Sequence, residues 1–104
     1  MDKCALITGA TRGIGKQIAI TLAKQGYNIA LNYRKENEEL ENTKKEIEKI
    51  GVQVLAVKGD VANFENCENF VKQVIERFGQ IDVLVNNAGI TKDMLLMRLS
   101  LIHI

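Results

Sequence analysis

The chain has 104 residues, enough for one small domain, and its composition is that of an ordinary globular protein, with 46% hydrophobic and 26% charged residues. Its net charge of +1 gives no electrostatic footprint for nucleic acid or an anionic membrane. Since no apolar stretch approaches the roughly 20 residues of a membrane span and no signal peptide is evident, we expect a cytoplasmic protein without nucleic-acid or membrane partners.

The two cysteines, Cys4 and Cys67, have neither the spacing of a metal site nor the number needed for a disulfide framework. Both fall on predicted core faces, so we expect two buried, reduced thiols. The single histidine, His103, supports no metal or catalytic interpretation, and we predict no metal site.

The first predicted element is a short strand at residues 4–7, which is apolar throughout and therefore expected to be buried on both faces. A glycine-rich turn follows at residues 8–15, and a helical pattern then runs to Gly26. The apolar residues of this helix are Ile14, Ile18, Ala19, Leu22 and Ala23. The order of strand, glycine turn and helix directs backbone N–H groups at one point, which is typical of a pyrophosphate site. A purely structural glycine turn is the alternative.

Strands and helices continue to alternate along the rest of the chain. The predicted elements are a strand at 28–33, a helix at 35–50, a strand at 52–57, a helix at 63–78 capped by Asn63, and a strand at 81–85. This alternation predicts an α/β fold with a doubly wound parallel sheet of the Rossmann type, in the strand order 3-2-1-4, with helices on both faces. Ligands of such folds bind at the carboxyl ends of the strands, beside the switch between strands 1 and 4.

The residues that end the second strand discriminate between the two nicotinamide cofactors. An acidic side chain there binds the ribose hydroxyls of NAD, whereas a cationic one accommodates the 2′-phosphate of NADP. Here the strand ends in Tyr33 and Arg34 without an acid, and Arg12 lies in the neighbouring turn. Because two guanidinium groups can bracket a phosphate, we predict NADP(H) as the cofactor. The alternative is that Arg34 simply begins a solvated helix.

Polar and small residues also follow the third and fourth strands. Asp60 and Val61 are placed for an adenine ring, with the acid toward the exocyclic amine and the valine against the ring face. Asn87, Ala88 and Gly89 follow the fourth strand, where small residues let the backbone approach a ribose. The alternatives are a helix-approach residue at Asp60 and a plain turn at Asn87.

The glycine turn, the Asp60-Val61 pair and the segment 86–89, at these separations, resemble the short-chain dehydrogenase/reductase family over residues 3–98. The resemblance implies that residues 1–98 are the amino-terminal part of a single dinucleotide-binding domain, which is truncated here, and that the full-length form is a homotetramer. The implied cofactor-binding residues are Gly9, Ala10, Thr11, Arg12, Gly13, Ile14, Gly15, Tyr33, Arg34, Asp60, Val61, Asn87, Ala88 and Gly89.

Within that family, residues 89–98 resemble the members that act on acyl chains carried by acyl carrier protein in fatty-acid biosynthesis. The implied reaction is hydride transfer from NADPH to the 3-keto carbon, which yields the 3-hydroxyacyl product. A non-catalytic NADP-binding module and a reductase of another ketone, such as acetoacetyl-coenzyme A, are the alternatives.

The family's catalytic groups are an Asn, a Ser and a Tyr-x-x-x-Lys set, and the resemblance implies that they lie beyond residue 104. Neither Tyr27 nor Tyr33 is followed by lysine four positions on. We therefore expect the chain to hold a cofactor but to have no turnover by itself. Residues 99–104 depart from the family pattern and look like a translated sequencing adapter, so we expect a non-native tail.

Overall fold

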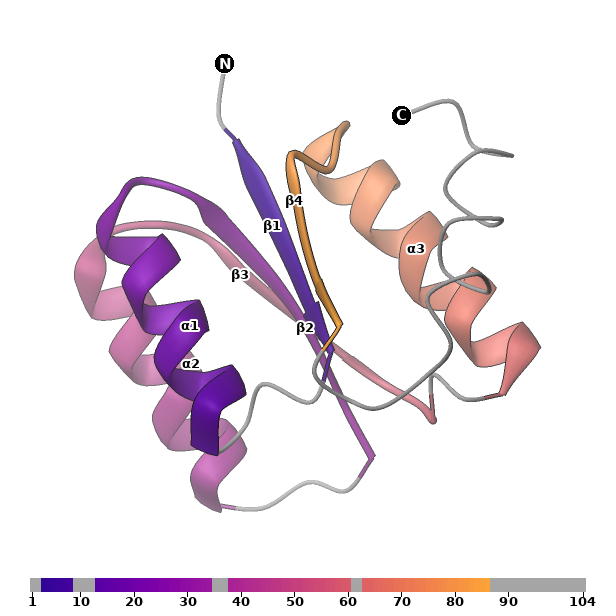
Figure 1. The fold of residues 1–104 in the computed structure, drawn as a ribbon, viewed down its shortest axis with the longest axis horizontal. Helices are drawn as coiled ribbons and strands as arrows, with labels where there is room; N and C mark the ends of the chain where they lie inside the picture. The colour runs from indigo at the N-terminus through magenta and orange to yellow at the C-terminus, as the bar shows by residue number, and fades with distance from the viewer. Residues whose placement is uncertain (1–2, 9–12, 35–37, 61–62, 87–104) are drawn as a thin grey trace.

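The computed structural model describes residues 3–8, 13–34, 38–60 and 63–86. Strands and helices alternate along them, as Figure 1 shows: β1 (Cys4–Thr8), α1 (Gly13–Lys24), β2 (Asn28–Tyr33), α2 (Glu38–Ile50), β3 (Val54–Lys58), α3 (Phe64–Phe78) and β4 (Val83–Asn86). The strands form one parallel sheet in the order β3-β2-β1-β4, which confirms the predicted topology.

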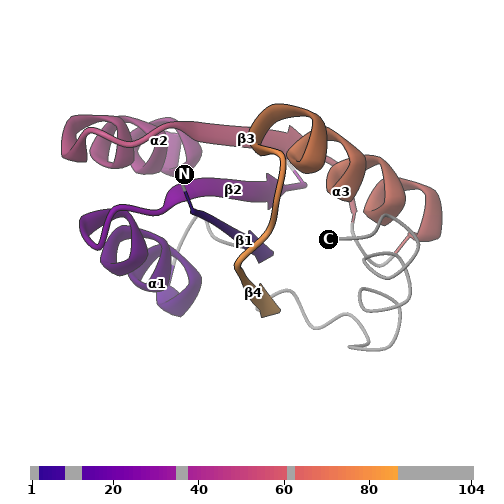
Figure 2. The same ribbon diagram turned by 90° about the horizontal axis from the view of Figure 1, so that it is seen from above.

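Helices cover both faces of this sheet, as predicted. Figure 2 shows α1 and α2 on one side of the strands and α3 on the other. Along β1, Ala5 and Ile7 belong to the core under α1 and α2, whereas Cys4 and Leu6 belong to the core under α3. Successive strand side chains point to opposite faces, so a strand covered on both sides must be apolar throughout. All five residues of β1 are buried.

Three predicted boundaries agree with the structure to within a few residues. The strand predicted at 28–33 is confirmed without change, and the strand predicted at 4–7 extends one residue further, to Thr8. The helix predicted at 35–50 is described from Glu38, because residues 35–37 lie outside the described part of the chain.

The last strand begins later than predicted. The sequence pattern predicts a strand over 81–85, whereas β4 starts at Val83. At Asp82 the carboxylate Oδ2 accepts the backbone N–H of Cys4 at 2.8 Å, while the N–H of Asp82 donates to the carbonyl of Cys4 at 2.8 Å. A side-chain oxygen therefore replaces a backbone carbonyl as the partner of β1, and the regular ladder begins one residue later.

The third strand is displaced for the same reason. The prediction is 52–57, and the observed strand is Val54–Lys58. Before it, the N–H of Gln53 donates to the side-chain Oδ1 of Asn28 at 3.0 Å. Here too a side-chain oxygen takes the place of a backbone carbonyl as the acceptor. Both boundary errors come from side chains that bond across the sheet, which a periodic pattern along one strand does not reveal.

The helix α3 confirms the strongest periodic signal of the sequence. Its core face consists of the buried residues Cys67, Phe70, Val71 and Val74. The predicted cap is also confirmed, because Asn63 Oδ1 accepts the N–H of Asn66 at 3.2 Å. None of the helices in the described ranges is long and apolar enough to cross a membrane.

The apolar stripe expected along α1 is only partly correct. Gly15, Ala19 and Ala23, spaced four residues apart, form the buried face of this helix. Ile14, which the sequence also assigns to the cofactor site, is instead 74% exposed. It begins the row Ile14, Ile18 and Leu22, which runs beside the buried row, and Ile18 and Leu22 are themselves only partly buried.

Both cysteines are free and fully buried, which confirms the prediction made for them. Burial, together with the nearby charge of Asp82, raises the pKa of the Cys4 thiol to about 12, so it stays protonated at neutral pH. Within the described residues, no group of three or more His, Cys, Asp or Glu side chains is placed to hold a metal ion.

Asp82 is expected to make the stability of the fold depend on pH. Hydrogen bonds from the backbone N–H of Cys4 and from the side chain of Gln80, and the charge of Lys3, lower its pKa. A group with a lowered folded-state pKa stabilises the fold above its unfolded pKa of about 4, and this contribution disappears as the pH falls through the folded value. Asp82→Ala should therefore lower the free energy of unfolding at pH 7 and have progressively less effect as the pH falls below about 4.

Urea unfolding of the chain between pH 2 and 7 measures this difference. Glu48→Ala, which removes an exposed acid from α2, controls for the general loss of a negative charge. An equal loss of stability in Asp82→Ala at both ends of the pH range would show that its carboxylate charge is not responsible.

Candidate functional site

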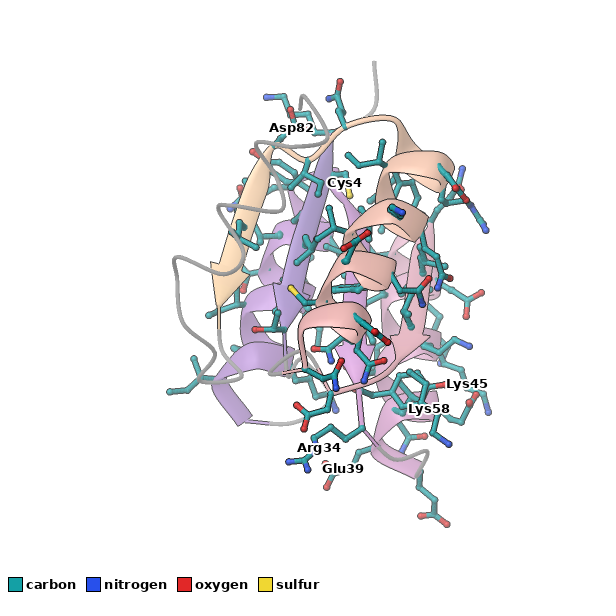
Figure 3. The ribbon with its side chains drawn as sticks, turned by 90° about the vertical axis from the view of Figure 1, so that its right-hand side faces the viewer. Cys4, Arg34, Glu39, Lys45, Lys58 and Asp82 are labelled. Carbon is teal, nitrogen blue, oxygen red and sulfur yellow. The ribbon has the colours of Figure 1, made fainter. Side chains whose placement is uncertain are left out.

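The carboxyl ends of the four strands lie along one edge of the sheet. Thr8 is in register with Asn86 at the ends of β1 and β4, and Tyr33 is in register with Lys58 at the ends of β2 and β3. All segments that the sequence assigns to a cofactor site therefore start from this edge, because parallel strands finish together. Figure 3 shows Arg34 at this end of the molecule and Cys4 and Asp82 at the opposite end.

The start of α1 favours an anion at this edge. Gly13 begins the helix with φ of 65°, a conformation that residues with a Cβ rarely adopt. No acidic residue occupies the first turn, so no side-chain carboxylate competes with a bound anion for the positive end of the helix dipole. Gly15, in the same turn, is buried. This arrangement can bind phosphate oxygens.

The structure brings together two of the predicted site residues, Arg34 and Asp60. The guanidinium Nη2 of Arg34 lies 3.7 Å from Oδ2 of Asp60. The side chain of Arg34 is 77% exposed and that of Asp60 is 46% exposed. Ion pairs between such exposed groups contribute about 0–1 kcal/mol. The guanidinium is therefore available to a more strongly charged anion, such as a phosphate, which it can bind through two parallel hydrogen bonds.

Tyr33 is the last residue of β2 and immediately precedes Arg34, and its side chain faces the α1 and α2 side of the sheet. It is partly buried and packs against the core under α1 and α2. Its ring is therefore part of the core on the α1 and α2 side of the sheet, and Arg34 follows it just after the strand ends.

Three residues outside the predicted site, Asn32, Gly59 and Thr8, connect the ends of neighbouring strands through hydrogen bonds. The side chain of Asn32 donates to the carbonyl of Gly59 at 2.8 Å, and the N–H of Gly59 donates to the carbonyl of Tyr33 at 2.8 Å. On the other side, Thr8 Oγ1 donates to the carbonyl of Val85 at 3.5 Å. The available signal was Asn32 itself, a polar residue near the end of a predicted strand.

The other predicted cofactor residues lie outside the described part of the chain. They are Gly9, Ala10, Thr11, Arg12, Val61, Asn87, Ala88 and Gly89. Their assignment to pyrophosphate, adenine and ribose stays a prediction. The proposed tail at residues 99–104 lies outside the described residues as well.

Comparison with known proteins identifies the family. A family model described as short chain dehydrogenase matches residues 3–102. The chain belongs to the short-chain dehydrogenase family. This short-chain dehydrogenase is 50% identical over 99 residues to the 3-oxoacyl-[acyl-carrier-protein] reductases FabG of Staphylococcus epidermidis and Staphylococcus aureus. The match covers 95% of the chain but only 41% and 40% of those relatives, so the chain spans about two fifths of their length.

Solved structures of short-chain dehydrogenases have the same fold. A short-chain dehydrogenase/reductase from Sinorhizobium meliloti superposes with a TM-score of 0.80 at 35% identity, over 88% of this chain and 42% of that one. A metagenomic short-chain oxidoreductase in complex with NADP superposes with a TM-score of 0.76 at 35% identity, over 85% of this chain and 39% of that one. The sheet order and the two helical layers described above are therefore those of the short-chain dehydrogenase family.

Proposed function

We propose that this short-chain dehydrogenase is part of an NADPH-dependent oxidoreductase that converts 3-oxoacyl-[acyl-carrier-protein] to the 3-hydroxyacyl form in fatty-acid biosynthesis. The observation that carries the proposal is the 50% identity over 99 residues to reductases of that name. Because the match covers 41% of their length, we assign the activity to a protein in which further residues complete the domain and supply the catalytic groups. We further propose that this protein is a cytoplasmic homotetramer.

The described residues fit NADP(H) better than NAD(H). The second strand ends in a cation, Arg34, and residues 28–34 contain no acid that would bind the ribose hydroxyls of NAD. Its guanidinium is largely exposed, and its partner Asp60 lies at 3.7 Å, beyond direct hydrogen-bond distance. The solved metagenomic relative in complex with NADP, at 35% identity, supports the same choice.

Each part of this edge has a proposed role toward the cofactor. The amino end of α1, with Gly13 and Gly15, binds the pyrophosphate, and Arg34 neutralises the 2′-phosphate together with Arg12. Asp60 accepts from the adenine amine, and the small residues after β4 leave room for the ribose. When bound, NADPH supplies the hydride for the 3-keto carbon. The described residues hold and orient the cofactor, and the proton donor is assigned to the residues beyond this chain.

The test is to express the protein from its complete reading frame and assay it with NADPH and two substrates. We expect a Ser and a Tyr-x-x-x-Lys set after residue 98, faster reduction of 3-oxoacyl-[acyl-carrier-protein] than of acetoacetyl-coenzyme A, and no turnover by the 104-residue chain. Lack of reduction of either substrate would favour a non-catalytic NADP-binding module. Exclusive use of the coenzyme A thioester would favour a different ketone reductase.

A further inference from the structure

Asn32 is a buried amide near the carboxyl end of β2. It is 3% exposed, and its Nδ2 donates to the carbonyl of Gly59 at 2.8 Å. The N–H of Gly59 donates in turn to the carbonyl of Tyr33, also at 2.8 Å. Gly59 follows the last residue of β3, and both its N–H and its carbonyl are hydrogen-bonded to residues of β2. We call these two hydrogen bonds the Asn32 clamp.

Gly59 has little freedom to leave this position. Its φ is 156°, a conformation that residues with a side chain rarely adopt. An added Cβ would also lie 3.3 Å from the Cβ of Asn66 in the first turn of α3. The backbone at Gly59 is therefore confined between β2 on one side and α3 on the other.

The clamp lies directly beside the two charged residues of the site. Arg34 follows Tyr33 in sequence, and Asp60 follows Gly59, so both charged side chains start from backbones that the clamp joins. Their own ion pair is exposed and contributes little, about 0–1 kcal/mol. Asn32 is buried and Gly59 is partly buried, and hydrogen bonds shielded in this way resist water and salt better than such a pair. The clamp rather than the ion pair therefore decides how far apart the backbones that carry Arg34 and Asp60 lie.

We propose that Asn32 is a positioning residue for cofactor selection, acting through the carbonyl of Gly59 to hold Arg34 and Asp60 at a fixed separation. This inference rests on the proposed NADP site at the same edge. Without the amide donor, the 59–60 segment shifts relative to β2, and Asp60 no longer holds the guanidinium of Arg34 where a 2′-phosphate meets it. A ligand that carries the 2′-phosphate should lose more affinity than the same ligand without it.

Asn28 provides a matched control on the same strand. It is also buried, at 7% exposure, and its side chain also bonds to the backbone beside β3, where Oδ1 accepts the N–H of Gln53 at 3.0 Å. It differs from Asn32 in lying at the amino end of β2, away from Arg34. Leucine has nearly the shape of asparagine without its polar atoms, so Asn28→Leu and Asn32→Leu remove comparable bonds at opposite ends.

The experiment is an NMR titration of the full 104-residue chain with 2′,5′-ADP and with 5′-AMP. We expect the unsubstituted chain to bind 2′,5′-ADP about tenfold more tightly, the value of one charge-assisted hydrogen bond. Asn32→Leu should reduce this ratio to about twofold, whereas Asn28→Leu should keep it near tenfold even if both variants melt at lower temperature. An unchanged ratio in Asn32→Leu, or an equal loss in both variants, would overturn the inference.

Two further results separate this inference from the proposed function. Equal binding of the two ligands by the unsubstituted chain would overturn the NADP assignment and the inference together. If Asn32→Leu does not fold, hydrogen exchange in the unsubstituted chain tests the clamp directly. The backbone amide of Gly59 should exchange as slowly as those inside β2, and exchange at the rate of an exposed loop would overturn the inference.

Discussion

Replacing Arg34 with aspartate is expected to reverse the preference for the phosphorylated ligand, lowering affinity for 2′,5′-ADP relative to 5′-AMP about 100-fold. Removing a charge-assisted hydrogen bond costs about 1.5–3 kcal/mol, and the new carboxylate also repels the phosphate. The effect is increased by Asp60, whose Oδ2 lies 3.7 Å from the guanidinium in the unsubstituted chain and would then face a second negative charge. The ratio of the two dissociation constants, measured by the same NMR titration, reports the change.

Two controls separate the role of Arg34 from a general charge effect. Arg34→Lys keeps the charge but loses the planar fork, so we expect a smaller loss, of about threefold. Arg77→Asp makes the same charge change on an exposed arginine in the last turn of α3 and should leave the ratio unchanged. If Arg77→Asp changes the ratio as much as Arg34→Asp does, Arg34 is not the phosphate-binding residue.

Phe70→Ala is expected to unfold the chain at room temperature. Phe70 is the largest of the fully buried side chains, 1% exposed, and belongs to the core that joins α3 to the strands. Removing a buried phenylalanine costs about 3–5 kcal/mol, which is a large part of the stability of an ordinary domain. Circular dichroism should show the loss of the cooperative thermal transition.

The two buried thiols give an independent measure of the same event. Cys4 and Cys67 are inaccessible in the folded chain and belong to the same core as Phe70. Both should react rapidly with a thiol reagent in Phe70→Ala and slowly in the unsubstituted chain. Phe78→Ala, on the same helix but only partly buried, should cost less and keep the thiols protected. Protected thiols in Phe70→Ala would mean that this side of the core tolerates the cavity.

Much of the fold is predictable from patterns along the chain. Apolar runs and helical periodicity placed all seven described elements in order, and the preference for right-handed crossovers predicted the sheet order that is observed. The errors occur where side chains bond across the sheet. Asp82 and Asn28 replace backbone carbonyls beside β4 and β3, and each moves a strand boundary away from the apolar run.

The candidate site is harder to predict from patterns along the chain. The sequence places Arg34 and Asp60 after two different strands, 26 positions apart by their numbers, and predicts only that both lie at one edge. The helical pattern includes Ile14 among the apolar residues of its helix, although this side chain is 74% exposed. The reason is that the apolar row at positions 14, 18 and 22 and the row at 15, 19 and 23 are neighbours on the helix, and only packing against the sheet decides which of them is buried.

Local pattern and composition account for the kinds of element, their order and the cation that ends the second strand, because each depends on neighbouring residues alone. The encounter of Arg34 with Asp60 and the Asn32 clamp depend instead on the register of β2 against β3. Asn32 meets the carbonyl of Gly59 across 27 positions of sequence, and no local signal specifies that distance. Register is set by the packing of all the strands between two helical layers, so only the folded chain brings these groups together.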